Sequence, residues 1–314
     1  MTSSNPQRDR DIFISWALAF LFFLGYYLSI IYGPHPALTI GIAIGLFGLM
    51  AGVLNHRYGS GQIVPSWRAN PSLFALVTIV FYLITKVSSL LLHEWSHSTV
   101  AYLLGVTNKS PLDIYYGTDW TFRGMTAIND TAVYSSLMAS GSGVDAGMIF
   151  IAGPLMNVFL SVIALALLFW PRARQSSIAF FFIFWAALHN VSQVWSYIPI
   201  RSVLYDGGDV YYFETALGIS PWLVTAVGTA MLTAAFAILF ISVFPSLCIK
   251  LRLAHPEKAA IFALAWFTAF VWNGLFPLIL SGAGFGGRVG IVILEVAVGI
   301  GMFSNVIISH RHRL

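Results

Sequence analysis

Long apolar runs separated by short polar segments dominate this sequence. A helix that crosses a membrane needs roughly 17–25 predominantly apolar residues. Runs of that length predict eight spans, at 12–32, 37–54, 73–104, 146–170, 178–198, 223–244, 259–280 and 289–309. The third run is longer than one crossing requires, so its helix should tilt or project beyond the membrane.

Composition supports a membrane protein. Hydrophobic residues make up 58% of the 314 and charged residues only 9%, whereas a soluble domain carries about 25% charged residues. Lipid is therefore the expected partner of the apolar surface. The net charge of +4 does not indicate nucleic acid binding, because the basic residues sit at the ends of the predicted spans. The single cysteine, Cys248, excludes an internal disulfide and a cysteine-based zinc cluster.

The distribution of Lys and Arg between the spans predicts an orientation. One alternating set of segments holds eleven of these residues, and the other set holds four, which are Lys109, Arg123, Arg201 and Arg288. Cytoplasmic segments of membrane proteins carry the excess of positive charge. Both termini of this integral, multi-pass protein are therefore expected in the cytoplasm.

A short polar string near the end of the third run carries the chemistry. His93 and His97 are four residues apart, so they lie on one face of a helix and can chelate a single ion. The pattern His-Glu-x-x-His is typical of zinc metalloproteases, in which the Glu, here Glu94, is the general base. Three polar side chains on one turn inside lipid also need a compensating interaction, which a divalent cation supplies.

A catalytic zinc takes three protein ligands and leaves one position open, so a third ligand is required. Asp206 is the best candidate, because it follows the fifth span and precedes Gly207 and Gly208, which permit a sharp turn. The same Asp-Gly-Gly string is also ordinary turn chemistry. If Asp206 is only a turn residue, Asp209 and Glu214 are the substitutes.

The segment at 105–145 is the longest one between spans, and it contains β-favouring aromatic residues around a Gly-Thr pair. Residues 112–122 therefore predict a small β-hairpin, with an ordinary extramembrane loop as the alternative. A substrate helix must unwind before hydrolysis, and its freed backbone groups could pair with a strand edge here. The residues of this candidate substrate strand are Tyr115, Tyr116, Trp120 and Phe122.

Three landmarks follow one another along the third to fifth spans. They are His93-Glu94-Trp95-Ser96-His97 followed by Ala-Tyr-Leu-Leu-Gly at 101–105, Gly153-Pro154-Leu155-Met156-Asn157, and the segment from Pro199 to Asp206-Gly207. In this order they resemble the site-2 protease family of intramembrane zinc metalloproteases, over about residues 73–218. The resemblance implies that His93, His97 and Asp206 bind Zn²⁺, that Glu94 is the general base, and that the substrates are membrane-spanning proteins.

The chain departs from that family in two respects. Pro199 and Asp206 are two residues further apart than in the family's pattern. Ser196 occupies the position of an Asn that is thought to help stabilise the tetrahedral intermediate in the family. Because Ser196 replaces this Asn, the group that stabilises the intermediate in this chain is unassigned.

Other polar residues inside the spans are candidates for supporting roles. Asn157, Asn190 or Gln193 could replace the missing Asn in stabilising the intermediate, and Asn157 or Asn190 could instead hydrogen-bond a metal ligand. His189 could hydrogen-bond a metal ligand, with an ordinary interhelical hydrogen bond as the alternative. Lys86 is expected to pair with a carboxylate, for which Glu295 is the candidate, with electrostatic tuning of the site as the alternative.

These observations predict an all-α polytopic membrane protein of about eight transmembrane helices, with a three-helix catalytic core and the small β-hairpin. Three parts are expected along the chain. They are two N-terminal transmembrane helices and a linker at 1–72, the zinc metalloprotease core at 73–218, and three C-terminal transmembrane helices at 219–314. No peptide-binding or nucleotide-binding module is expected from the sequence, so control should come from the first two spans, from the last three spans or from another membrane protein.

The predicted function is hydrolysis of peptide bonds in membrane-spanning proteins by metal-activated water. A non-catalytic zinc-binding protein or a chaperone of membrane segments, with the same fold, is the alternative that Ser196 keeps open. A zinc transporter fits less well, because transport needs repeated weak sites along a path. The charge count also places the histidine pair near the external face, whereas the site of the resembled family usually lies nearer the cytoplasm.

Overall fold

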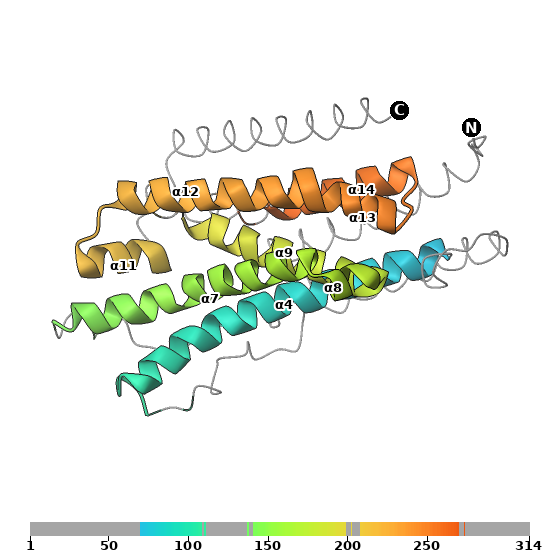
Figure 1. Cartoon of the computed structure of the whole chain (residues 1–314). Coiled ribbons are helices and arrows are strands. Elements are labelled where there is room, and N and C mark those ends of the chain that lie inside the picture. The colour runs from blue at the N-terminus through green and yellow to red at the C-terminus, as the bar shows by residue number, and fades with distance from the viewer. Residues whose placement is uncertain are drawn as a thin grey trace, which may run out of the picture.

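The computed structural model describes residues 70–108, 110, 137, 141–198, 202, 208–269 and 273. Every regular element within these ranges is a helix (Figure 1). Several predictions lie outside the described residues: the spans at 12–32, 37–54 and 289–309, the end of the span at 259–280, the β-hairpin at 112–122, and Asp206.

Within the described ranges, four helices are long and apolar enough to cross a membrane. They are α4 (Pro71–Leu103), α7 (Gly143–Phe169), α9 (Ser177–Tyr197) and the run Pro221–Lys250, which joins α12 (Pro221–Ala237), a π-helix (Ile238–Val243) and α13 (Phe244–Lys250). The described helices outside these four are shorter: α8 (Pro171–Gln175), α11 (Asp209–Leu217) and α14 (His255–Trp266). The four long helices agree with the predicted spans at 73–104, 146–170, 178–198 and 223–244.

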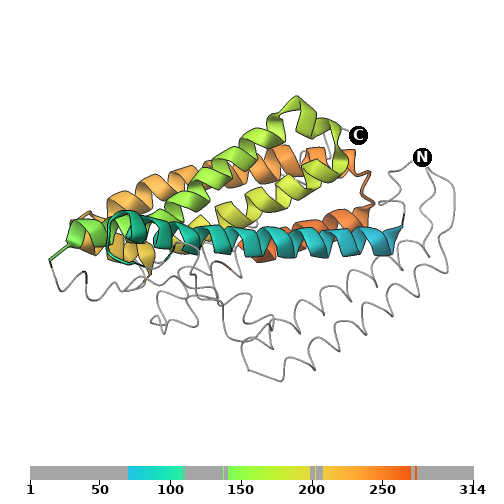
Figure 2. The ribbon, with the colours of Figure 1, turned by 90° about the horizontal axis from the view of Figure 1, so that it is seen from below.

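The central helix is α9, which runs between the α4–α7 pair and α12 (Figures 1 and 2). In the most apolar 18-residue stretch of α9, 67% of the residues are buried, whereas the corresponding values are 28% for α4 and 33% for α7. Its rings Phe181 and Phe184 contact Phe74 of α4 and Phe244 of α13, respectively. Lipid is as apolar as these rings, so the expulsion of water does not hold such helices together. Close packing between the side chains does.

Exposed apolar side chains line the outer helices. On α7, Leu155, Phe159 and Val162 are between 55% and 60% exposed, and Trp222 at the start of α12 is 71% exposed. Continuous apolar surface of this kind suits lipid better than water. The surface therefore agrees with the membrane protein that the composition predicts.

The short helix α11 lies against the first turns of α7. Phe150 of α7 stacks on Tyr212 of α11 with ring centroids 4.9 Å apart. A Cβ on Gly147 would lie 2.9 Å from the side chain of Leu217, so the glycine permits this close approach. Gly208, just before α11, has a φ of +92°, a conformation that residues with side chains rarely adopt. Together these contacts fix the position of the first residue of α11.

Candidate metal centre

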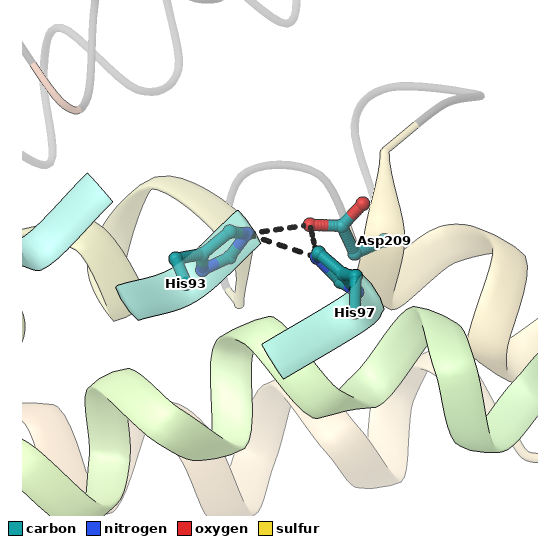
Figure 3. Close-up of side chains that lie close together, drawn as sticks. All are labelled: His93, His97 and Asp209. Atoms are coloured by element: carbon teal, nitrogen blue, oxygen red, sulfur yellow. Dashed lines mark hydrogen bonds and ion pairs between the residues drawn. The ribbon is translucent and has the colours of Figure 1, made fainter. Parts of the chain in front are cut away.

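His93 and His97 lie on one face of α4, as their spacing predicts. Their Nε2 atoms are 3.2 Å apart, and both side chains are almost fully buried. The carboxylate of Asp209, the first residue of α11, points at the same spot (Figure 3). Its Oδ2 lies 3.0 Å from Nε2 of His93 and 3.4 Å from Nε2 of His97. These three residues form a group that can hold a metal ion.

Hydrogen bonds hold both imidazoles in the tautomer that leaves Nε2 unprotonated. Nδ1 of His97 donates to the backbone carbonyl of Ile149, and Nδ1 of His93 donates to the side-chain oxygen of Asn157, both at 2.6 Å. The orientation of the Asn157 amide follows from its nitrogen, which donates to the backbone carbonyl of Ser89, a group that only accepts. Each Nε2 therefore presents a lone pair to the centre of the group.

The resulting arrangement fits a small cation. Two unprotonated nitrogens and a carboxylate oxygen repel one another at this range unless a proton or a cation lies between them. Ligand atoms held at about 2.0–2.1 Å by a tetrahedral Zn²⁺ are about 3.3–3.4 Å from one another. The observed separations are 3.0, 3.2 and 3.4 Å. The donor set, two imidazoles and one carboxylate, is also one that catalytic zinc sites use.

Gly153 of α7 leaves open the space beside both ligand atoms. A Cβ at this position would lie 2.4 Å from Nε2 of His97 and 2.6 Å from Nε2 of His93. Carbon atoms do not approach nitrogen this closely without a bond, so any side chain would displace the histidines. The glycine is therefore part of the site, although it contributes no chemical group.

The electrostatics of Asp209 keep it ionised. Burial favours its protonated form, but the positive charge that a proton or a cation brings to the histidine pair outweighs burial and holds the pKa of Asp209 well below its usual range. Its place in the first turn of α11 adds the favourable field of a helix N-terminus. The side chain is 20% exposed whereas that of His93 is fully buried, so the approach to the group lies on the Asp209 side.

The predicted polar residues of α7 and α9 form a network behind His93. The nitrogen of Asn157 donates to the side-chain oxygen of Asn190 at 2.9 Å and to the hydroxyl of Ser89 at 3.1 Å. The Ser89 hydroxyl in turn donates to Asn190. Asn157 and Asn190 thus support a ligand, one of the two roles considered for them. Glu94, next to His93 on α4, is 9% exposed.

Two further predicted residues lie elsewhere in the bundle. The ring of His189 lies 4.6 Å from the ring of Tyr82, which precedes His93 by eleven residues or about 16 Å on α4. Lys86 donates to the side-chain oxygens of Gln193 and Asn273, both at 3.2 Å. Glu295, the carboxylate considered as its partner, lies outside the described residues.

Of the two substitutes considered for Asp206, one lies at the third corner of the candidate group. Asp209 joins the histidines, whereas Glu214 accepts a hydrogen bond of 2.5 Å from Ser202 at another point of α11. Asp206 itself lies outside the described residues.

Sequence reasoning missed Tyr197, the last residue of α9. Its hydroxyl lies 3.2 Å from Nε2 of His93, and its ring stacks on that imidazole with centroids 5.1 Å apart and an interplanar angle of 15°. An aromatic residue in an apolar span is normally assigned to lipid contact. The nearest signal was the neighbouring Ser196, where the chain departs from the resembled family.

Comparison with known proteins adds no relative. No protein family, curated protein or solved structure matches this chain. A function for the chain is therefore inferred from its own residues and their geometry.

Proposed function

We propose that this chain is an intramembrane metalloprotease that hydrolyses peptide bonds of membrane-spanning proteins with a zinc ion held by His93, His97 and Asp209. One observation carries the proposal: lone-pair atoms from α4 and α11 converge within 3.4 Å of one another beside the general-base candidate Glu94. Polar and charged groups are costly in a helix that crosses lipid. A cluster of this kind therefore indicates chemistry rather than packing.

The residues of the site have separate roles in the proposed reaction. Zinc, when bound, supplies a Lewis acid and lowers the pKa of a water molecule to about 7. Glu94 accepts the proton of the attacking water and passes it to the leaving amine. Asn157 and the Ile149 carbonyl fix the two imidazoles through Nδ1, so that each directs Nε2 to the centre.

The position of the histidines within α4 supports a membrane-embedded substrate. Both lie within Leu73–Leu103, a helix that is long and apolar enough to cross a membrane. A peptide bond that reaches them therefore enters the region that lipid occupies. The carbonyl groups of a substrate helix are hydrogen-bonded, and local unwinding must precede attack. The predicted strand at 112–122 remains our candidate for pairing with the unwound segment.

The test compares wild type with Glu94→Gln in lipid vesicles, together with a panel of single-span membrane proteins whose cleavage is followed by mass spectrometry. We expect one zinc per chain in both proteins and cleavage by wild type only, with a loss of about 10²- to 10⁴-fold in the variant. Zinc in both proteins without cleavage by either would indicate the non-catalytic zinc-binding protein. Wild type without zinc would contradict the proposal.

A further inference from the structure

We infer that Tyr197 is a catalytic residue that donates a hydrogen bond from its phenol to the substrate oxygen on which negative charge develops. This inference rests on the proposed protease function and assigns the group that was left open there. Hydrolysis of a peptide bond needs preorganised donors at that oxygen. Ser196 stands where the resembled family has an Asn for this purpose, so another donor must supply the interaction.

Ser196 does not fill the role itself. Its hydroxyl donates to the backbone carbonyl of Gln193 at 2.7 Å, and its side chain is 3% exposed. A serine hydroxyl has a single proton to donate. That proton is used within α9, one turn before Ser196.

The two candidate asparagines are also committed. The oxygen of Asn157 holds His93, and its nitrogen donates to Ser89 and Asn190. The nitrogen of Asn190 donates to the backbone carbonyl of Ala186 at 2.8 Å. Turning the Asn157 amide toward a substrate would release His93 from the contact that orients it.

Tyr197, in contrast, places a hydroxyl group directly at a ligand atom. Its hydroxyl lies 3.2 Å from Nε2 of His93, an atom at the centre of the group, and the ring is held by stacking on the imidazole. Because Nδ1 of His93 carries the ring proton, the phenol donates to Nε2. An ion bound to His93 takes up that lone pair, so the phenolic proton can no longer be donated there. The phenol then donates its hydrogen bond to the substrate oxygen that lies at the ion.

Burial makes this hydrogen bond effective. The side chain of Tyr197 is 6% exposed, and a donor in a site with little water stabilises developing charge more strongly than the same donor in water. The stacked ring also fixes the hydroxyl in advance, so little reorganisation accompanies the reaction. Tyr197 is therefore placed as a preorganised donor.

The test replaces Tyr197 by Phe, which removes the hydroxyl and keeps the ring. Tyr82→Phe is the matched control, because Tyr82 is equally buried and its hydroxyl contacts Thr268. The first measurement involves no turnover. It records the affinity of acetohydroxamate, which brings an anionic oxygen to the metal, from the visible spectrum of cobalt-substituted protein. We expect one cobalt per chain throughout, and about 10- to 100-fold weaker acetohydroxamate binding only in Tyr197→Phe.

The second measurement uses a single-span substrate that wild type cleaves. Tyr197→Phe should lower kcat about 100-fold with KM unchanged, and Tyr82→Phe should match wild type. Equal acetohydroxamate affinity in all three proteins, or unchanged kcat, would overturn the inference. Loss of cobalt from Tyr197→Phe would also overturn it, by showing that the phenol is a metal ligand. The proposed function fails separately, when wild type binds no metal or Glu94→Gln cleaves as fast as wild type.

Discussion

The side-chain oxygen of Asn157 lies 2.6 Å from Nδ1 of His93, so an amide of α7 orients a metal-ligand candidate of α4. The contact selects the tautomer of the imidazole and limits rotation of its ring. Metal-bound histidines usually donate their second nitrogen to an acceptor of this kind, and loss of the acceptor costs about 10- to 100-fold in metal affinity.

Asn157→Leu should therefore weaken zinc binding by about 10- to 100-fold, measured by competition with a chromophoric chelator. Ser161→Ala is the control, since the Ser161 hydroxyl donates to the backbone carbonyl of Asn157 without touching His93. It should bind zinc as wild type does. Equal zinc affinity in wild type and Asn157→Leu would show that the amide does not support the ligand.

Gly153→Ala should abolish stoichiometric zinc binding. The added methyl group would lie within 2.6 Å of both Nε2 atoms and would force the histidines apart. Gly228→Ala, in α12, is the matched control, because its methyl group would meet the side chain of Ile198 and not a ligand candidate. Metal analysis of both purified variants checks the prediction, and zinc retained by Gly153→Ala would contradict the site geometry.

Asp209→Asn should lower zinc affinity by more than about 100-fold, a larger loss than removal of a supporting hydrogen bond causes. The carboxylate oxygen within 3.4 Å of both Nε2 atoms is then replaced by an uncharged amide. Asp206→Asn is made in parallel, because the resemblance favours that residue. Loss of zinc from Asp206→Asn alone would identify Asp206 as the ligand and Asp209 as a neighbour.

Glu214 should make the stability of the protein depend on pH. The side chain is 2% exposed, and one carboxylate oxygen has no hydrogen-bond partner among the described residues. Burial raises the pKa of Glu214 above the ordinary value of 4.5, although the hydrogen bond from Ser202 acts in the opposite direction. The folded protein thus binds this proton more tightly than the unfolded chain does. The stabilisation is complete below about pH 4.5 and is lost as pH rises through the folded pKa.

Glu214→Gln stays neutral, so its Tm should rise relative to that of wild type as pH increases from about 4.5 to about 8. Differential scanning fluorimetry in detergent measures both proteins at each pH. The difference between the two Tm values is the informative quantity, because other groups titrate equally in both. A difference that does not change with pH would show that Glu214 keeps its ordinary pKa in the folded protein.

The helices could be predicted from the sequence because hydrophobic length is a local property. The predicted span 178–198 corresponds to α9, Ser177–Tyr197, and the span 73–104 corresponds to the apolar helix Leu73–Leu103. The histidine pair is also local, since two residues four apart on any helix share a face. Both predictions needed no knowledge of how the helices pack.

The third ligand could not be selected in the same way. Asp206, Asp209 and Glu214 lie close together in the sequence, and the choice depends on where α11 begins and how it packs on α7. That packing uses Gly147, about sixty residues away, and no local pattern records such a contact. Tyr197 was missed for a related reason, because its significance comes from stacking on a residue of another helix.

The place of the histidines along α4 has a consequence for specificity. His97 lies six residues before the end of α4 at Leu103, or about 9 Å along the axis, whereas Pro71 at the other end is about 39 Å away. The hydrocarbon layer is about 30 Å thick, so a protease of the kind proposed above would cut its substrates near one face of that layer. Different substrates would then share a cleavage depth rather than a common sequence, and water would need to travel only a short way to reach them.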